Sequence, residues 1–186
     1  MITIKEKEAK AFDTLKGAFG YKNKMAAPHL VKVVISSSTG SGVKRDKNRN
    51  DLVAGRLAKI TGQKPAMRGA KKSIASFKIR TGDQVGVMVT LRGARMYNFL
   101  DKLINIALPR TKDYRGTERR IVDDIGNATL AIKEHTIFPE TTDEELKDVF
   151  GMGVTIVTTA KTKPEALAFF ELIGVPFKEA TETKKK

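Results

Sequence analysis

The sequence offers few of the side chains that catalysis needs. It contains no cysteine, and its two histidines, His29 and His135, lack a triad partner or the spacing of metal ligands. Asp123 and Asp124 have no partner carboxylate at a spacing that suits a metal ion or an acid–base pair. We therefore expect no catalytic residue, no metal site and no cofactor. The absence of cysteine also excludes disulfides and fits a reducing, cytoplasmic compartment.

A glycine-rich turn at residues 39–44, between a predicted strand and a predicted helix, is the one motif that suggests nucleotide chemistry. A phosphate-cradling loop needs Gly-Lys-Ser/Thr at its end, but here Val43 follows Gly42. The dinucleotide pattern also fails, because Arg45 stands where its third glycine belongs. A nucleotide-dependent enzyme is therefore disfavoured. The turn either contacts an RNA backbone or is purely structural.

The charge of the chain indicates a polyanionic partner. The 186 residues carry 35 Lys and Arg against 21 Asp and Glu, a formal net charge of +14. Twelve cations stand against two acids in residues 43–80, and residues 109–120 hold a second basic run. Concentrated charge of one sign is what phosphate neutralisation requires, and a merely solvated surface is the alternative. The acidic residues 140–148 are either a solvated helix start or a surface for a protein partner.

A membrane is the other polyanionic surface to consider. No stretch approaches the ~20 apolar residues that a spanning helix needs. The first residues alternate in charge and lack an apolar core, so we expect no secretory peptide. The mixed charges of the predicted helix over residues 4–19 also argue against binding to a membrane surface. We therefore expect no membrane partner.

The segment from Arg68 to Arg80 contains no acid and interleaves cations with one aromatic ring. Such cations neutralise phosphates, and a ring can stack on a base or a ribose. Phe77 has two interpretations: a loop anchor packed into the core, which is slightly favoured, or a stacking platform. The candidate contact residues of this loop are Arg68, Lys71, Lys72, Phe77, Lys78 and Arg80.

Hydrophobic periodicity predicts the elements that position this loop. Helices are expected over residues 4–19, 50–60 and 94–108, the last ended by Pro109, and a final helix starts at a capping box of Thr162 and Glu165. Strands are expected over residues 31–36, 63–68, 85–91, 129–133 and 152–160. This order predicts an α+β fold of the split β-α-β, ferredoxin-like type. Helices would cover one face of a mainly antiparallel sheet, with extra helices at both ends of the chain.

The other face of the sheet is expected to be open and to carry Lys32, Ser36, Thr90 and Arg92. The strand over residues 85–91 has no aromatic, and aromatic residues make up 6% of the chain. A sheet that binds free single strands usually stacks bases on aromatic side chains. We therefore favour structured RNA, recognised by phosphate, 2′-hydroxyl and shape, over the alternative of a single-stranded RNA regulator.

The chain contains an ordered series of motifs at residues 21–34, 60–65, 68–80, 89–93, 96–105, 107–110, 113–116, 132–134, 137–140 and 157–162. Together these motifs resemble the bacterial-type fifth large-subunit ribosomal protein family. The match runs from Tyr21 to Phe177, nearly the whole chain, which is more specific than any single motif. The chain departs from the family pattern at Ser36–Gly40, where the family usually has Asn-Met-Gly-Val-Gly, and at residues 117–125.

The resemblance implies a non-enzymatic component of the central protuberance of the large ribosomal subunit. Its implied partners are 5S rRNA, 23S rRNA, P-site tRNA, a small-subunit protein across the subunit interface and other central-protuberance proteins. By resemblance, the residues facing 5S rRNA would be Lys32, Ser36, Gln63, Thr90 and Arg92. The loop from Arg68 to Gly82 would extend toward tRNA, and residues 140–148 would be the place to seek the protein bridge. We expect one RNA-binding domain over residues 1–177, with residues 1–20 as an N-terminal helix and residues 178–186 as a polar tail.

Overall fold

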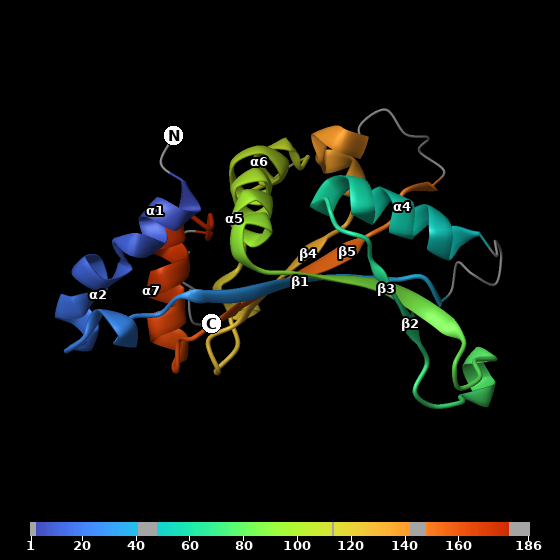
Figure 1. The fold of residues 1–186 in the computed structure, drawn as a ribbon, viewed down its shortest axis with the longest axis horizontal. Coiled ribbons are helices and arrows are strands. Elements are labelled where there is room, and N and C mark those ends of the chain that lie inside the picture. Colours follow the sequence, from blue (N-terminus) through green and yellow to red (C-terminus); the bar gives the residue numbers. More distant parts are fainter. Residues whose placement is uncertain (1–2, 41–47, 113, 142–147, 179–186) are drawn as a thin grey trace, which may run out of the picture.

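The fold is built on one five-stranded sheet in which every pair of neighbouring strands is antiparallel (Figure 1). The computed structural model describes residues 3–40, 48–112, 114–141 and 148–178. Along the sheet the strands run in the order β2 (Ala66–Gly69), β3 (Gln84–Leu91), β1 (Leu30–Ser38), β5 (Met152–Thr158) and β4 (Ala128–Ile132). The predicted α+β split β-α-β fold is confirmed. The β2 strand starts later than predicted because Pro65 has no backbone N–H for a ladder.

Helices lie on one side of the sheet and at one of its ends. In Figure 1, α4 and α5 lie above the sheet, whereas α1, α2 and α7 gather at the left. The α-helices are α1 (Ile4–Ala9), α2 (Ala11–Phe19), α4 (Arg49–Thr61), α5 (Gly93–Lys102), α6 (Leu108–Arg110) and α7 (Lys163–Ile173). Short 3₁₀ turns lie in the connections before and between the strands: η1 (Lys24–Ala26), η2 (Ala75–Phe77), η4 (Arg119–Ile121), η5 (His135–Ile137) and η6 (Pro139–Thr141).

The core forms between the helices and one face of the sheet. Alternation along each strand sends every second side chain to this face, as in β5, where Val154 and Ile156 are fully buried. The α4 residues Val53 and Leu57 are also fully buried, and so is Leu100 of α5. Because the apolar side chains are buried on one face, the opposite face of the sheet does not contribute to the core and can contact a partner.

The N-terminal segment is two helices rather than the single helix predicted over residues 4–19. Lys10 interrupts the helix and carries the turn between α1 and α2. Both helices pack against α7, and the Lys7 Nζ donates a hydrogen bond to the Ile173 carbonyl at 2.8 Å. The Tyr21 hydroxyl donates to Glu165 of α7, and burial together with this carboxylate raises the pKa of Tyr21. The segment is therefore held to the end of the sheet by specific polar contacts.

The predicted capping box at the start of α7 is absent. Thr162 is the N-cap residue, but its side chain makes no capping hydrogen bond. The Glu165 Oε2 accepts instead from the backbone N–H of Lys161 at 2.8 Å, while its other oxygen receives Tyr21. A complete capping box occurs at α1, between Thr3 and Glu6. Glu165 thus serves tertiary docking as well as the helix start.

The helix predicted over residues 94–108 changes its pitch before it ends. The α5 helix passes into a π turn, η3 (Leu103–Ala107), and then into α6, which contains Pro109. Pro109 was predicted to end the helix, but the helix runs one residue further, to Arg110. In the π turn the Leu108 N–H reaches back to the Leu103 carbonyl, five residues earlier. The extra residue keeps Leu103, Ala107 and Leu108 all buried.

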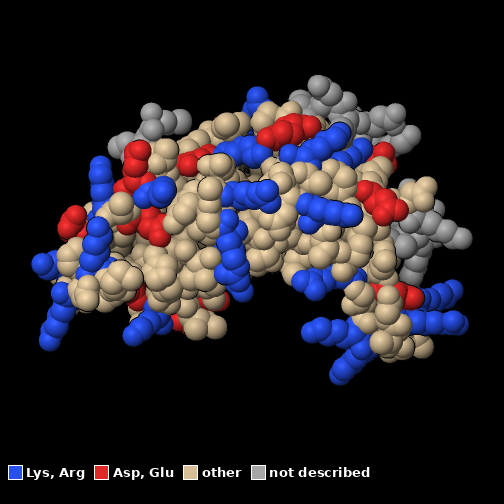
Figure 2. All heavy atoms as spheres, in the orientation of Figure 1, with Lys and Arg blue, Asp and Glu red and all other residues tan. Residues whose placement is uncertain are grey.

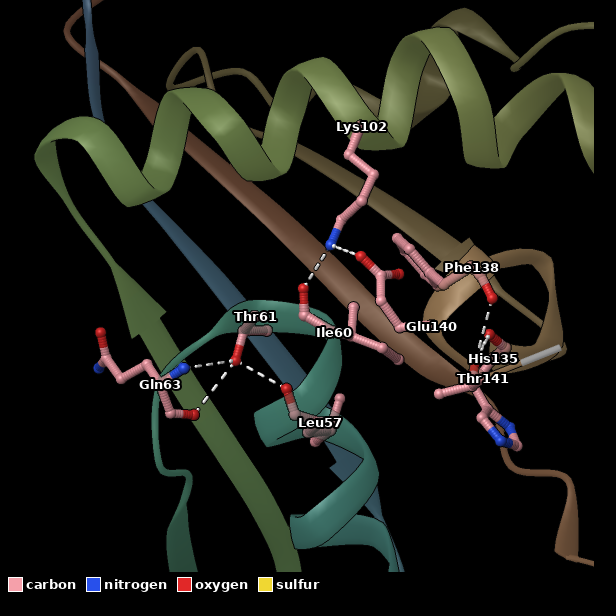
Figure 3. Close-up of polar contacts among 9 residues, drawn as sticks. All are labelled: Leu57, Ile60, Thr61, Gln63, Lys102, His135, Phe138, Glu140 and Thr141. Atoms are coloured by element: carbon pink, nitrogen blue, oxygen red, sulfur yellow. Dashed lines mark hydrogen bonds and ion pairs between the residues drawn. The ribbon is translucent and has the colours of Figure 1, made fainter. Parts of the chain in front are cut away.

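A half-buried lysine joins the end of α4 to α5 and to the turns after β4 (Figure 3). The Lys102 Nζ donates to the Ile60 carbonyl at 2.6 Å and lies 2.5 Å from the Glu140 Oε1. Its ammonium group also lies over the Phe138 ring, 5.9 Å from the centroid. The Ile60 carbonyl belongs to the last turn of α4, where carbonyls have no intrahelical partner, so Lys102 satisfies it.

Within the described residues, no helix combines the length and the apolar character that crossing a bilayer requires.

Lys102→Met should lower the free energy of unfolding by about 2 kcal/mol, because it leaves the Ile60 carbonyl and Glu140 without their cation while keeping the apolar stem. Urea denaturation monitored by circular dichroism measures the change. The matched control is Lys163→Met, whose partner Asp124 lies 3.5 Å away and is almost fully exposed, and which should cost less than about 0.5 kcal/mol. Equal effects of both substitutions would contradict a structural role for Lys102.

Candidate nucleic-acid interface

The face of the sheet opposite the core, called the open face here, is lined by small and neutral side chains between cationic margins. Strand register arranges it in rows, such as Ala66, Met88, Ser36, Gly153 and Ala131 across all five strands. The open face comprises Lys32, Val34, Ser36, Ser38, Ala66, Arg68, Gly86, Met88, Thr90, Thr129, Ala131, Gly153, Thr155 and Val157. Short side chains let a sugar–phosphate backbone approach closely.

Three of the predicted contact residues share this face. Ser36 is exposed and lies between Met88 and Gly153, while Thr90 lies opposite Val34. Lys32 is half-buried beside Val157, one row further along β1. The structure therefore brings Lys32, Ser36 and Thr90 together on one surface, as the alternation predicted. Their hydroxyl and ammonium groups suit ribose and phosphate oxygens.

The other two predicted residues, Gln63 and Arg92, lie at the border of the open face. Gln63 is half-buried, and its Nε2 donates to the Thr90 carbonyl at 3.2 Å. Thr61 holds the preceding turn, because its hydroxyl donates to the Leu57 carbonyl at 2.7 Å and contacts the Gln63 backbone (Figure 3). Arg92 is exposed and follows β3, so continuing the register of Val33 with Leu91 places it beside Lys32. Two cations therefore mark this end of the open face.

Residues 68–82 form a projection between β2 and β3, called the finger here (Figure 1). Its tip is closed by reciprocal backbone hydrogen bonds between Ile74 and Ile79, at 2.9 and 3.2 Å, around the turn η2. The hydroxyls of Ser73 and Thr81 lie 3.1 Å apart, and the Thr81 N–H donates to Ser73 at 3.0 Å. The finger is thus organised by its own hydrogen bonds rather than by the core.

The base of the finger depends on glycine and on Asp83. The Gly82 N–H donates to the Ala70 carbonyl, and the Ala70 N–H donates to the Asp83 carbonyl. Gly82 adopts φ +94, a conformation that side-chain-bearing residues rarely adopt. The Asp83 carboxylate accepts the Arg80 N–H at 2.7 Å. These contacts direct the basic residues of the finger away from the rest of the sheet.

The finger presents its side chains to solvent. Figure 2 shows Lys and Arg side chains radiating from it at the lower right. Phe77 is 61% exposed, so the favoured prediction that it packs into the core is wrong. The reason is geometric, because the 3₁₀ turn η2 and the left-handed Lys78 place Phe77 at the tip, beyond reach of the core. All six predicted loop residues are exposed: Arg68, Lys71, Lys72, Phe77, Lys78 and Arg80.

Not every cation of the basic stretch is available to a partner. Arg56, counted in the cluster of residues 43–80, is buried, and it donates to the Asp148 carbonyl at 2.7 Å. Its guanidinium lies 3.7 Å from the Asp148 carboxylate and 3.4 Å from the buried His135 ring. Arg56 therefore stabilises the fold. Helix periodicity could have shown this, since Arg56 lies three residues after Val53 on the buried side of α4.

Some carboxylates of the acidic stretch, residues 140–148, are likewise paired within the molecule. Glu140 pairs with Lys102, and Asp148 pairs with Arg56, so both ends of the stretch bind within the molecule. Residues 142–147 lie outside the described residues, as do residues 41–47, which include most of the glycine-rich turn. The Glu140 contact is visible in Figure 3. A protein bridge at residues 140–148 stays a prediction.

Sequence reasoning missed the contribution of β4 and β5 to the open face. The hydroxyls of Thr129 and Thr155 lie 3.1 Å apart on neighbouring strands and extend the row that contains Thr90. Alternation of small or polar residues with buried ones in both strands was the available signal. Arg95 was also missed, although its guanidinium lies 3.5 Å from the Gln63 Oε1. No group of acidic or histidine side chains suited to a metal ion occurs in the described ranges.

Gly82→Ala should lower the free energy of local unfolding of the finger by about 1 kcal/mol. Alanine is strained at φ +94, although its methyl group would meet no atom within 4 Å. Trypsin cleavage after the finger lysines should accelerate several-fold, with little change in the global urea midpoint. Gly55→Ala is the matched control, because an added methyl group there also meets no atom within 4 Å. In the α4 helix this change should raise the free energy of global unfolding by about 0.5–1 kcal/mol. A lower midpoint with unchanged cleavage would show that the finger is not a separate unit.

Comparison with known proteins shows similarity along most of the chain. Residues 23–80 match the family model described as ribosomal protein L5, and residues 84–177 match the model that describes the C-terminus of the same ribosomal protein family. The large ribosomal subunit protein uL5 of Heliobacterium modesticaldum is 49% identical over 160 residues, 86% of this chain and 88% of that protein. The uL5 of Kosmotoga olearia is 48% identical over 178 residues, which cover 95% of this chain and 97% of that protein. That of Thermotoga maritima is 48% identical over 171 residues, covering 92% of each.

Proposed function

Because the chain belongs to the ribosomal protein L5 (uL5) family, whose members are structural proteins of the large ribosomal subunit and not enzymes, we propose that it binds 5S rRNA and 23S rRNA in the central protuberance. We propose further that it contacts P-site tRNA and bridges to a small-subunit protein. The family places it in the ribosome, a cytoplasmic particle. The observation that carries the proposal is the open face, a surface of mostly small side chains with cations at its margins.

The open face fits a folded RNA better than free single strands. Its rows contain threonine, serine, alanine and glycine, and no aromatic ring occurs among its described residues. Hydroxyl groups such as those of Ser36 and Thr90 can meet 2′-hydroxyls, and small side chains allow close approach of an RNA backbone. Lys32 and Arg92 at one end of the open face can neutralise phosphates. This arrangement supports Lys32, Ser36, Gln63, Thr90 and Arg92 as contacts of 5S rRNA.

The finger supports a second, separate contact. Arg68, Lys71, Lys72, Lys78 and Arg80 extend from the sheet on a loop with internal hydrogen bonds, and Phe77 adds an exposed ring. Phosphates of a second RNA molecule can meet these cations, and a ribose or base can stack on the ring. The finger is therefore the part of the chain that we assign to the tRNA.

We propose that residues 1–177 act as one RNA-binding domain. Strands from both segments matched by family models enter a single sheet, since β1 and β2 belong to the first and β3, β4 and β5 to the second. Tyr21 and Lys7 dock the N-terminal helices onto α7. We place the protein bridge at residues 140–148 and other central-protuberance contacts on the remaining surface. Of the 178–186 tail, the structure describes Lys178 alone.

The affinity for a 5S rRNA transcript should fall about a thousandfold between ~50 and ~200 mM salt, as expected for six or more phosphate contacts. Lys32→Glu with Arg92→Glu should weaken binding and reduce the slope of log affinity against log salt by about 2. Filter binding measures both. The control, Lys5→Glu with Lys10→Glu, makes the same charge change at two exposed lysines of the N-terminal segment. A flat salt dependence, or equal losses in both variants, would remove the open face from the proposal.

Lys71→Glu with Lys72→Glu should weaken P-site tRNA binding to reconstituted ribosomes and leave the affinity for free 5S rRNA nearly unchanged, because the finger projects beyond the open face. Dissociation of labelled tRNA from the ribosomes and filter binding of 5S rRNA report the two contacts. The control, Lys22→Glu with Lys24→Glu, reverses two exposed lysines near the N-terminal helices. Equal loss of both affinities in the finger variant would show that the finger is not a separate site.

A further inference from the structure

A groove of about 660 Å³ lies away from the finger, between the end of α6, the last residues of β4 and the turn η5. In Figure 1, α6 and the orange turns that follow β4 lie together at the top, whereas the finger lies at the lower right. The groove touches the margin of the open face at Ala131. Neither of the RNA contacts proposed above uses its other lining residues.

The floor of the groove is apolar and its rim is cationic. Leu108 and Ile132 are buried, and Ile137 is half-buried beside them. The rim holds three exposed cations, Arg110, Lys112 and Lys133, and the described lining includes a single carboxylate, Glu134. An occupant that matches these walls carries apolar side chains toward the floor and negative charges toward the rim.

One wall of the groove is the free edge of a sheet. The β4 strand ends the sheet and pairs with β5 on one side. On the other side the described residues provide a single bridge, between Val122 and Ala128, at the start of the strand. Ala131, Ile132 and Lys133 line the groove beyond that bridge. An edge strand presents unpaired N–H and C=O groups, which an extended peptide can pair with.

From this edge, the apolar floor and the cationic rim, we infer that the groove binds an extended acidic–apolar peptide segment of a partner protein, added to β4 as a sixth strand. Alternation in such a strand sends apolar residues to Leu108, Ile132 and Ile137, and carboxylates to Arg110, Lys112 and Lys133. RNA fits the groove less well. The Tyr114 ring is half-buried, with its hydroxyl held by Thr117 at 2.8 Å, so it offers no stacking platform, and Glu134 repels phosphate.

The test uses the full chain and a library of ten-residue peptides in which Val, Ile, Leu or Phe alternates with acidic or basic residues. Selection should enrich the acidic peptides. The best of them, labelled with fluorescein, should lose about tenfold in affinity against Lys112→Glu with Lys133→Glu, as expected for two exposed charge pairs. The same reversal at Lys71 and Lys72, in the finger, should leave its affinity unchanged. Enrichment of basic peptides, no enrichment, or equal losses in both variants would overturn the inference.

Strand addition has a second signature in the peptide backbone. Successive N–H groups of a strand point to opposite sides, so N-methylation of every second residue should abolish binding for one set and spare the other. Equal effects of the two sets would exclude pairing with β4. A twelve-nucleotide RNA that displaces the peptide at equal or lower concentration would assign the groove to nucleic acid. Retention of 5S rRNA affinity by the groove variant separates this inference from the RNA proposal, which can fail independently.

Discussion

The packing of α4 and α5 on one face of the sheet is the contact on which the rest of the structure depends. Val33, Ile35 and Leu91 are fully buried there, and each such side chain contributes about 1.5–3 kcal/mol by leaving water. Because strand residues alternate, this burial also decides which residues stand on the opposite face. A one-residue slip of β1 would exchange Ile35 for Ser36 in the core, so folding and the RNA surface are specified by the same register.

Repulsion among the cationic side chains opposes the compact fold. A chain with a net charge of +14 repels itself, and the structure limits the cost by pairing some cations inside and sending others outward. Arg56 is buried and Lys102 is half-buried, and both bind backbone carbonyls and carboxylates. The finger cations, in contrast, stand apart from the core on a loop with its own hydrogen bonds. Polyanion binding would relieve the remaining repulsion, which fits a protein that works inside an RNA particle.

Residues with strong local patterns allowed prediction of the fold class, the five strands and the exposed basic loop. Strict alternation in residues 85–91 and the acid-free run from Arg68 to Arg80 are signals that tertiary structure did not override. The errors lie at residues whose tertiary contacts or local turns the pattern did not reveal. Glu165 receives Tyr21 as well as the Lys161 N–H, Arg56 binds Asp148 inside the fold, and the turn at Lys78 places Phe77 at the tip of the finger. The contacts with Tyr21 and Asp148 cannot be inferred from neighbouring sequence, although helix periodicity indicates that Arg56 is buried.

The π turn at Leu103–Ala107 acts as one extra residue accommodated within a continuous helix. If the same residues adopted ordinary α-helical pitch instead, everything after the turn would be rotated by about 100°. Leu108 would then leave the core, and Arg110 would swing off the groove that it now borders. The pitch of residues 103–107 therefore determines the shape of the groove as well as the packing of the helix.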